Sequence, residues 1–181
     1  MHPAIAPGNV AVVTGAANGI GAAAVEALAR EVAERLGPVS VLMNNAGVGG
    51  GGDALSNPAG WQRVLGVNLM GVLHGVQAFV PAMAASGAPG LVVNTGSKQG
   101  VTMPPGDTAY NVSKAGVKAL TEGLAHTLRN TAGCQVSAHL LVPGFTYTGM
   151  VASRIPERPP SAWTSEPVSY THLTLPTNSR V

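Results

Sequence analysis

Apolar residues along the chain fall into short continuous runs and longer runs with helical spacing. The short runs predict strands at residues 10–14, 39–43, 91–95 and 136–142, and each is followed by turn residues or a loop. The longer runs carry apolar side chains three or four positions apart and predict helices at residues 20–36, 61–85 and 108–129, the last with Asp107 as its N-cap. Strands without strict alternation, separated by helices, are typical of a parallel sheet covered on both faces. We therefore expect an α/β fold.

Composition narrows the class of protein. The 181 residues fit one domain, and 45% hydrophobic against 10% charged residues exclude a disordered polar chain. The net charge of +2 arises without any basic run, so we expect no nucleic-acid partner. Residues 64–97 carry no charge, but polar, proline and glycine positions interrupt them. They are interpreted as buried helix and strand, and no membrane partner is expected.

Cysteine and histidine usage indicates the compartment and argues against a metal. Cys134 is the only cysteine, so neither an intrachain disulfide nor a cysteine cluster can form. The first nine residues show no secretory signal, and we expect a reducing, cytoplasmic location. The histidines lack the spacing of metal ligands, and no metal site is predicted.

Two glycine-rich stretches follow the first two strands. At residues 14–21, before the first helix, glycines let the backbone approach a pyrophosphate, and a helix N-terminus offers unpaired N–H groups to it. This stretch therefore predicts a dinucleotide-binding loop, and the alternative is an ordinary glycine-rich turn. The glycine run at 49–52 predicts a flexible loop.

Tyr110 and Lys114 are four residues apart on a predicted helix, which places them on one face. An ammonium about 5 Å from a phenol, at an effective dielectric near 20, is worth ~3 kcal/mol or ~2 pKa units. We expect this charge to lower the pKa of Tyr110, which then exchanges a proton with an alcohol or carbonyl oxygen. Ser97, at the end of the third strand, can hold the same oxygen. Alone, it is interpreted as a serine that caps the strand end.

Six motifs occur in an order that resembles the short-chain dehydrogenase/reductase family, over about residues 10–150. They are Thr14-Gly-x-x-x-Gly-x-Gly21, Asn44-Asn-Ala-Gly47, Asn68, Ser97, Tyr110-x-x-x-Lys114 and Pro143-Gly-x-x-x-Thr148. The resemblance implies a Rossmann-like doubly wound parallel sheet. It also implies an NAD(P)-dependent oxidoreductase that transfers a hydride between the nicotinamide and a small alcohol or carbonyl substrate.

The same resemblance implies roles for individual residues. Tyr110 is expected to be the acid/base, Lys114 to lower its pKa and hold the nicotinamide ribose, Ser97 to orient substrate, and Asn68 to support a proton relay. The expected cofactor-binding residues are Thr14, Gly15, Asn18, Gly19, Ile20, Gly21, Asn44, Ala46, Gly47, Tyr110, Lys114, Pro143, Gly144, Thr146 and Thr148. A homo-dimer or homo-tetramer through the helices at 61–85 and 108–129 is expected as well.

The spacing between the first two strands departs from the family. Gly15 and Asn44 are 29 residues apart, so two βα units of about 40 to 50 residues in all are absent, and the join is placed near residues 30–31. Strands two and three of the order 3-2-1-4-5-6 are then missing, and a core of about four strands in the order 1-4-5-6 is predicted. The preference for NAD or NADP is unreadable, because the strand that reads it is absent.

The shortened connection also raises a question of handedness. If the first helix stays on its usual face, its crossover becomes left-handed, whereas such crossovers are almost always right-handed. Moving the helix to the other face restores the hand and moves the phosphate loop with it.

The end of the chain is unlike the family. Residues 168–177 resemble a translated sequencing adapter, so residues 168–181 are interpreted as a non-native tail, and residues 1–167 as one incomplete NAD(P)-binding domain. A natural disordered tail is the alternative. For the function, the alternative is an inactive remnant of the family that only forms homo-oligomers or binds nucleotide weakly.

Overall fold

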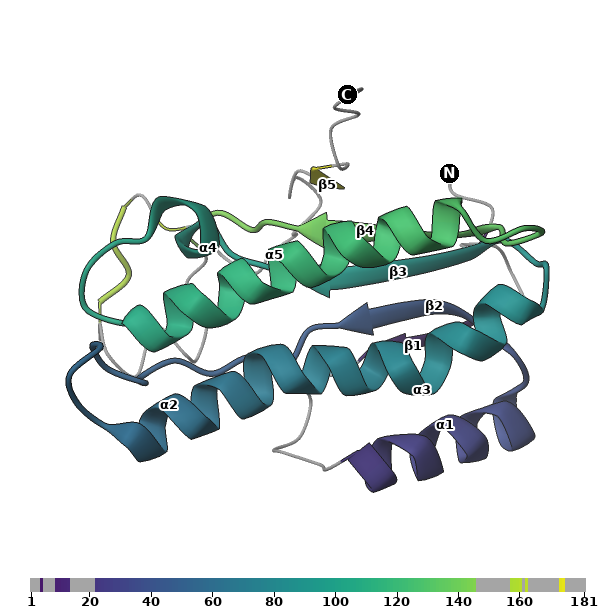
Figure 1. Cartoon of the computed structure of the whole chain (residues 1–181), viewed down its shortest axis with the longest axis horizontal. Coiled ribbons are helices and arrows are strands. Elements are labelled where there is room, and N and C mark those ends of the chain that lie inside the picture. Colours follow the sequence, from purple (N-terminus) through teal and green to yellow (C-terminus); the bar gives the residue numbers. More distant parts are fainter. Residues whose placement is uncertain are drawn as a thin grey trace.

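The computed structural model describes residues 4, 9–13, 22–145, 157–160, 162 and 173–174. Four parallel strands form its centre, namely β1 (Val10–Val13), β2 (Val39–Asn44), β3 (Gly90–Thr95) and β4 (Val136–Leu141). They lie side by side in chain order (Figure 1). The predicted contiguous four-stranded core is thereby confirmed. A two-residue strand, β5 (Leu173–Thr174), pairs antiparallel with β4 from within the expected tail.

The three long helices follow the predicted pattern, and a short helix, α4 (Gln99–Thr102), occurs where only a loop was expected. The other helices are α1 (Ala22–Leu36), α2 (Pro58–Leu65), α3 (Gly71–Ala85) and α5 (Thr108–Arg129). Between α2 and α3 the backbone adopts a five-residue π-helix, η1 (Gly66–Met70), so the predicted helix at 61–85 has a π-helical turn inside it. Asn57 caps α2 by accepting from Gly60 N–H, which starts the helix earlier than predicted.

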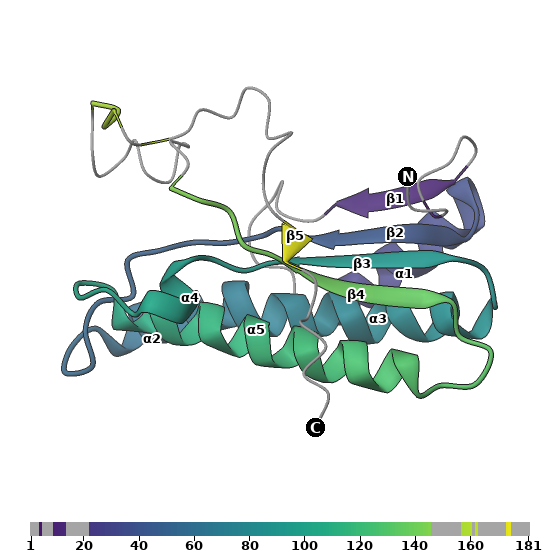
Figure 2. The same cartoon turned by 90° about the horizontal axis from the view of Figure 1, so that it is seen from above.

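The three long helices α1, α3 and α5 all lie on one face of the sheet (Figures 1 and 2). Each strand pairs with the one that follows it in the chain, always in the same direction across the sheet. Right-handed crossovers in one direction put every connecting helix on the same side. In the described part of the chain the three long helices thus lie on one face, and the predicted α/β class, a parallel sheet with flanking helices, is confirmed. The handedness question is answered by α1, which packs on α3 and takes the face that keeps its crossover right-handed.

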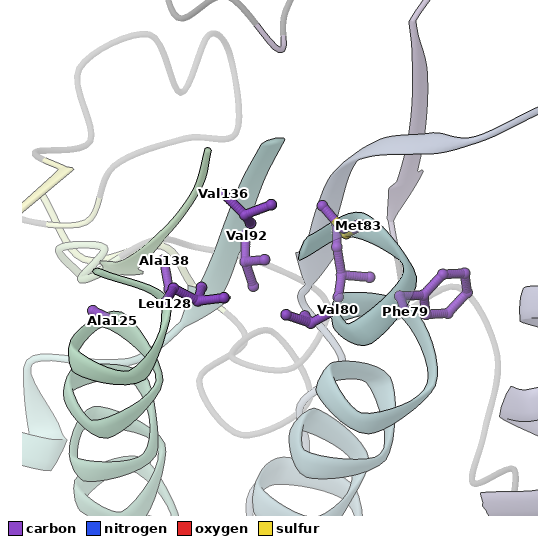
Figure 3. Packing of buried hydrophobic residues seen from close by; sticks show 9 residues of the cluster. Phe79, Val80, Met83, Val92, Ala125, Leu128, Val136 and Ala138 are labelled. Atoms are coloured by element: carbon purple, nitrogen blue, oxygen red, sulfur yellow. The ribbon is translucent and has the colours of Figure 1, made fainter. Parts of the chain in front are cut away.

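The main hydrophobic core lies between these helices and the sheet. Leu42, Val92 and Ala138 project from the strands and are at most 3% exposed. Side chains of α3 and α5 meet them there, including Met83 and Leu128 (Figure 3). A smaller cluster on the opposite face joins Leu91 and Val93 of β3 to Ala4 near the N-terminus. The core therefore fixes α3 and α5 against the strands whose ends carry the candidate site.

One continuous helical run, Pro58–Ala85, is long and apolar enough to cross a membrane by length and composition, with a mean hydropathy of 1.4. In the structure this run packs on β2, β3 and α1. Length and composition alone are weak grounds for a membrane assignment, because the core helix of a sheet meets the same criteria.

Candidate active site

The candidate site lies where the carboxyl ends of β2 and β3 reach the start of α5. In an open parallel sheet, ligands bind beyond the carboxyl ends of the strands, because the loops that follow them converge there. The loops at 45–52 and 96–107 leave β2 and β3 in this direction, toward α4 and the first turn of α5 (Figures 1 and 2).

Tyr110, Lys114 and Ser97 come together at this edge. Lys114 extends along α5 to donate from Nζ to the carbonyl oxygen of Thr95 at 2.7 Å, and Nζ lies 5.8 Å from the centre of the Tyr110 ring. Ser97 lies two residues beyond the end of β3, near enough for its side chain to lower the pKa of the Tyr110 hydroxyl. The predicted one-face placement of tyrosine and lysine is present in the structure, and the strand end brings the serine to it.

The electrostatics of the pair differ from the prediction. Burial is the main cause that raises the pKa of Tyr110, and the charge of Asp107 adds to it, while the hydrogen bond from Ser97 opposes both. The expected lowering of the Tyr110 pKa is therefore wrong. The reason is that burial penalises the phenolate, whereas Lys114 directs its ammonium at Thr95. Burial also lowers the pKa of Lys114 from 10.5 to about 8.

Asn68 lies in the π-helical segment η1 and is fully buried. Its amide oxygen accepts from Val48 N–H at 2.8 Å, and its Nδ2 donates to the Val48 carbonyl at 2.9 Å and to Ser113 Oγ at 3.0 Å. The side chain thus holds the loop after β2 against α5, and these hydrogen bonds go to Val48 and Ser113 rather than to Tyr110 or Lys114. π-Helical turns are frequent at functional sites, but no sequence pattern predicted the turn at Asn68.

Asn44, expected at the cofactor, has its side chain in the core. It is 2% exposed and donates from Nδ2 to Asn94 Oδ1 at 2.8 Å, and Asn94 in turn donates to Thr121. Its own Oδ1 is buried without a partner and faces Gly75, where a Cβ would overlap it. The amide therefore ties β2 to β3 beneath the sheet, while Ala46 and Gly47 follow on the loop beyond the strand.

Other expected site residues are only partly placed. Pro143 and Gly144 follow β4 at the same edge of the sheet. The remaining expected cofactor residues lie outside the described residues, namely Thr14, Gly15, Asn18, Gly19, Ile20, Gly21, Thr146 and Thr148. Among the described residues, no group of three or more His, Cys, Asp or Glu side chains comes together in a way that could hold a metal ion.

The residues present fit one half of a nicotinamide dinucleotide. The ammonium of Lys114 and the hydroxyls of Tyr110 and Ser97 are donors suited to ribose and substrate oxygens. They lie at the strand edge where such cofactors bind in open α/β sheets. The stretch at residues 14–21, expected from the sequence to bind the pyrophosphate, lies outside the described residues.

Sequence reasoning found Asp107 only as a helix cap and missed its second set of contacts. Its carboxylate accepts from Tyr110 N–H at 3.3 Å, as predicted for a cap, and also from Gly50 N–H at 2.6 Å and Gly51 N–H at 3.1 Å. The run at 49–52, expected to be flexible, thus has a fixed partner. The only sequence signal for this contact between the loop and Asp107 is the glycine run itself. Glycine permits the positive φ angles with which Gly50 and Gly52 turn the loop back.

Comparison with known proteins relates these features to a family. The model of the short chain dehydrogenase family matches residues 23–159. A galactitol 2-dehydrogenase (L-tagatose-forming) of Cereibacter sphaeroides is 40% identical over 141 residues, which cover 76% of this chain and 53% of that protein. The chain thus spans about half the length of the curated relatives it matches.

Solved structures agree with this relation. A short-chain dehydrogenase/reductase of Burkholderia phymatum, in complex with NAD, is 45% identical with a TM-score of 0.69, over 77% of this chain and 50% of that one. A gluconate 5-dehydrogenase of Burkholderia cenocepacia, in complex with NADP and tartrate, is 28% identical with a TM-score of 0.69, over 76% and 52%. Nicotinamide dinucleotides of both kinds therefore occur among proteins of this fold.

Proposed function

The chain belongs to the short-chain dehydrogenase/reductase family, and we propose that it is an NAD(P)-dependent oxidoreductase for a small alcohol or carbonyl substrate. The observation that carries the proposal is the convergence of Tyr110, Lys114 and Ser97 at the carboxyl edge of the sheet. Reversible carbonyl reduction requires three groups of a protein: a hydroxyl that can exchange a proton, a cation beside it, and a second hydroxyl.

Each residue has a distinct part in the proposed reaction. In reduction, Tyr110 Oη donates its proton to the carbonyl oxygen, and Ser97 Oγ donates a hydrogen bond that orients the same oxygen. In oxidation, the Tyr110 phenolate takes the proton of the alcohol. The nicotinamide, when bound, supplies or accepts the hydride.

Lys114 serves this step in two ways. Its ammonium stabilises the Tyr110 phenolate that forms when the proton leaves, and it donates to ribose hydroxyls of the cofactor. With a pKa of about 8, it is mostly charged at neutral pH, as both tasks require. Burial raises the pKa of Tyr110, which favours the neutral phenol that donates the proton in the reduction direction.

The finer assignments are also proposals. The name of the Cereibacter relative gives galactitol as its substrate, so a polyol is the first alcohol to test. Ethyl acetoacetate serves as the carbonyl probe. We propose a cytoplasmic location, supported by the single cysteine.

A homo-dimer or homo-tetramer through the helices at 61–85 and 108–129 is supported by Met70 and Val112, which are 39% and 43% exposed on those helices. Sedimentation of the purified chain tests the assembly.

Binding and turnover test the function in sequence. NADH and NADPH are titrated by their fluorescence, and turnover is then followed at the nicotinamide absorbance with galactitol and ethyl acetoacetate. Tyr110→Phe is expected to lose turnover and still bind nucleotide, because Lys114 keeps the ammonium that donates to the ribose. Lys114→Met is expected to lose both nucleotide affinity and turnover. Its matched control, Lys118→Met, is expected to lose neither, because the half-exposed Lys118 on the same helix pairs with Glu122 at 2.8 Å.

One result would overturn the proposal. If the wild-type chain binds neither nucleotide and is as inert as Tyr110→Phe, the inactive-remnant alternative replaces it. The tail at 168–181 is tested separately by reading the encoding DNA, because codons unrelated to an adapter would make it a natural segment.

A further inference from the structure

The loop at 49–52 approaches the first turn of α5 more closely than ordinary side chains allow. A Cβ at Gly51 would overlap the Cβ of Ala109, so glycine is required at this contact. Gly50 and Gly52, on either side, both have φ of 84°, in the left-handed region that glycine adopts without strain. The backbone between them presents consecutive N–H groups to one side, an arrangement that binds anions.

The anion that occupies this backbone concavity is the carboxylate of Asp107. Its Oδ2 accepts from Gly50 N–H at 2.6 Å and its Oδ1 from Gly51 N–H at 3.1 Å. The same Oδ1 accepts from Tyr110 N–H at 3.3 Å, in the first turn of α5. Hydrogen bonds to a charged acceptor are shorter and stronger than neutral ones. One side chain therefore fastens the loop and caps the helix that carries Tyr110.

The loop is also held from the side of α2, so it is fixed between two helices. Arg63 donates to the Gly49 carbonyl at 2.7 Å, and Asn57 donates to the Gly50 carbonyl at 3.3 Å. On the α5 side, Ala109 N–H donates to the Gly52 carbonyl at 3.3 Å. These hydrogen bonds hold the glycine run, which alone would sample many conformations, in a single conformation.

We propose that Asp107 is a positioning residue, which uses its carboxylate to fix the backbone of residues 49–52 against the first turn of α5 and so builds the wall of the substrate site beside Tyr110. Asp107 and Tyr110 belong to the same helical turn, so this wall keeps its place relative to the Tyr110 hydroxyl. A substrate that meets the wall is held in register with the proton donor. The substrate part of this inference rests on the function proposed above.

Hydrogen exchange of the Gly50 and Gly51 amides tests the fastening without any turnover. Asp107→Ser is the informative variant, because serine caps a helix well but is too short and uncharged to hold two loop N–H groups. We expect these two amides to exchange about 10-fold faster or more, while the amides of α5 beyond its first turn keep wild-type rates. Unchanged exchange at Gly50 and Gly51 would overturn the proposal.

A matched control and a conservative variant keep the test decisive. Asp53→Ser makes the same substitution just beyond the loop, where the Asp53 carboxylate binds Leu55 N–H at 2.9 Å and Ser56 Oγ at 2.8 Å in its own turn. It is expected to leave the Gly50 and Gly51 amides unchanged. Asp107→Asn keeps the shape and one oxygen, so it supplies a folded variant if serine is not tolerated. Its exchange is expected to lie between wild type and Asp107→Ser, and wild-type exchange in it would count against the proposal.

Steady-state kinetics with galactitol and NAD, and with ethyl acetoacetate and NADPH, test the substrate role. We expect Asp107→Ser to raise KM for the galactitol or ethyl acetoacetate about 10-fold, with KM for the nucleotide unchanged. Faster exchange with an unchanged substrate KM would overturn the substrate role. If the wild-type chain transfers no hydride, the proposed function fails, while exchange at Gly50 and Gly51 still decides whether Asp107 fastens the loop.

Discussion

The burial of Lys114 has a measurable consequence for stability. Its side chain is 3% exposed, and burial lowers its pKa from 10.5 to about 8. Each pKa unit corresponds to about 1.4 kcal/mol, so holding this ammonium inside the fold costs about 3 kcal/mol below pH 8. Its hydrogen bond to the Thr95 carbonyl, at 2.7 Å, returns about 1 kcal/mol. We therefore expect Lys114→Met to be about 2 kcal/mol more stable than wild type at pH 7.

The sign of the pH dependence follows from proton counting. Between the folded pKa of about 8 and the unfolded value of 10.5, the unfolded chain binds the proton that the folded chain has lost. The free energy of unfolding of wild type therefore rises with pH in this window, by up to about 1.4 kcal/mol per pH unit from this group. Below pH 8 both states are protonated and the contribution is constant. The advantage of Lys114→Met is expected to disappear between about pH 8 and 10.

Urea unfolding followed by far-UV circular dichroism, at pH values from about 7 to 9.5, measures these free energies. The difference between wild type and variant is the quantity to compare, because other groups titrate alike in both. Lys118→Met is the control on the same helix, and its exposed pair with Glu122 predicts a change of no more than about 0.5 kcal/mol without a slope in this window. A wild-type advantage over Lys114→Met at pH 7, or a difference that does not narrow above pH 8, would refute the reasoning.

Three further outcomes are expected. Gly75→Ala places a Cβ against the buried Asn44 Oδ1 and is expected to lower the free energy of unfolding by about 1 to 3 kcal/mol, measured by urea denaturation; a neutral effect would mean that Asn44 can move aside. Tyr110→Phe is expected to lower kcat by about 100-fold or more while nucleotide still binds, measured in the binding and turnover assays described above, and turnover equal to wild type would assign the proton to another group. Deletion of residues 168–181 removes only the two-residue β5 from the described sheet and is expected to shift the melting temperature by a few degrees at most; unfolding of the shortened chain would show the tail to be part of the domain.

Local sequence patterns predicted the individual elements well. Short apolar runs bounded by glycine, proline and asparagine indicated β2 and β3, and apolar positions on one face indicated α5 with Asp107 as its cap, all of which the structure contains. The order of the four parallel strands was also predictable, because strands lost from an edge leave a contiguous remainder. The π-helical turn around Asn68 was not predictable, since it depends on how the helix meets the Val48 loop and α5.

The candidate site was predictable in its residue types and not in its environment. Spacing alone placed Tyr110 and Lys114 on one face of a helix, but the direction of the Tyr110 pKa shift depends on burial, which no spacing reveals. Asn44 shows the same limit, because the resemblance implied a place at the cofactor while the structure turns its amide into the core against Asn94.

The sequence by itself determined the family, the four parallel strands and the placement of the tyrosine and lysine on one helix face, because these depend on local periodicity and fixed spacing along the chain. Only the tertiary structure decided that α1 joins α3 and α5 on one face, since the hand of a crossover is a property of the whole sheet. It also decided that Asp107 reaches 56 and 57 residues back to Gly51 and Gly50. A contact between residues so far apart in the chain forms only when the sheet brings two loops to one edge, and no local pattern encodes it.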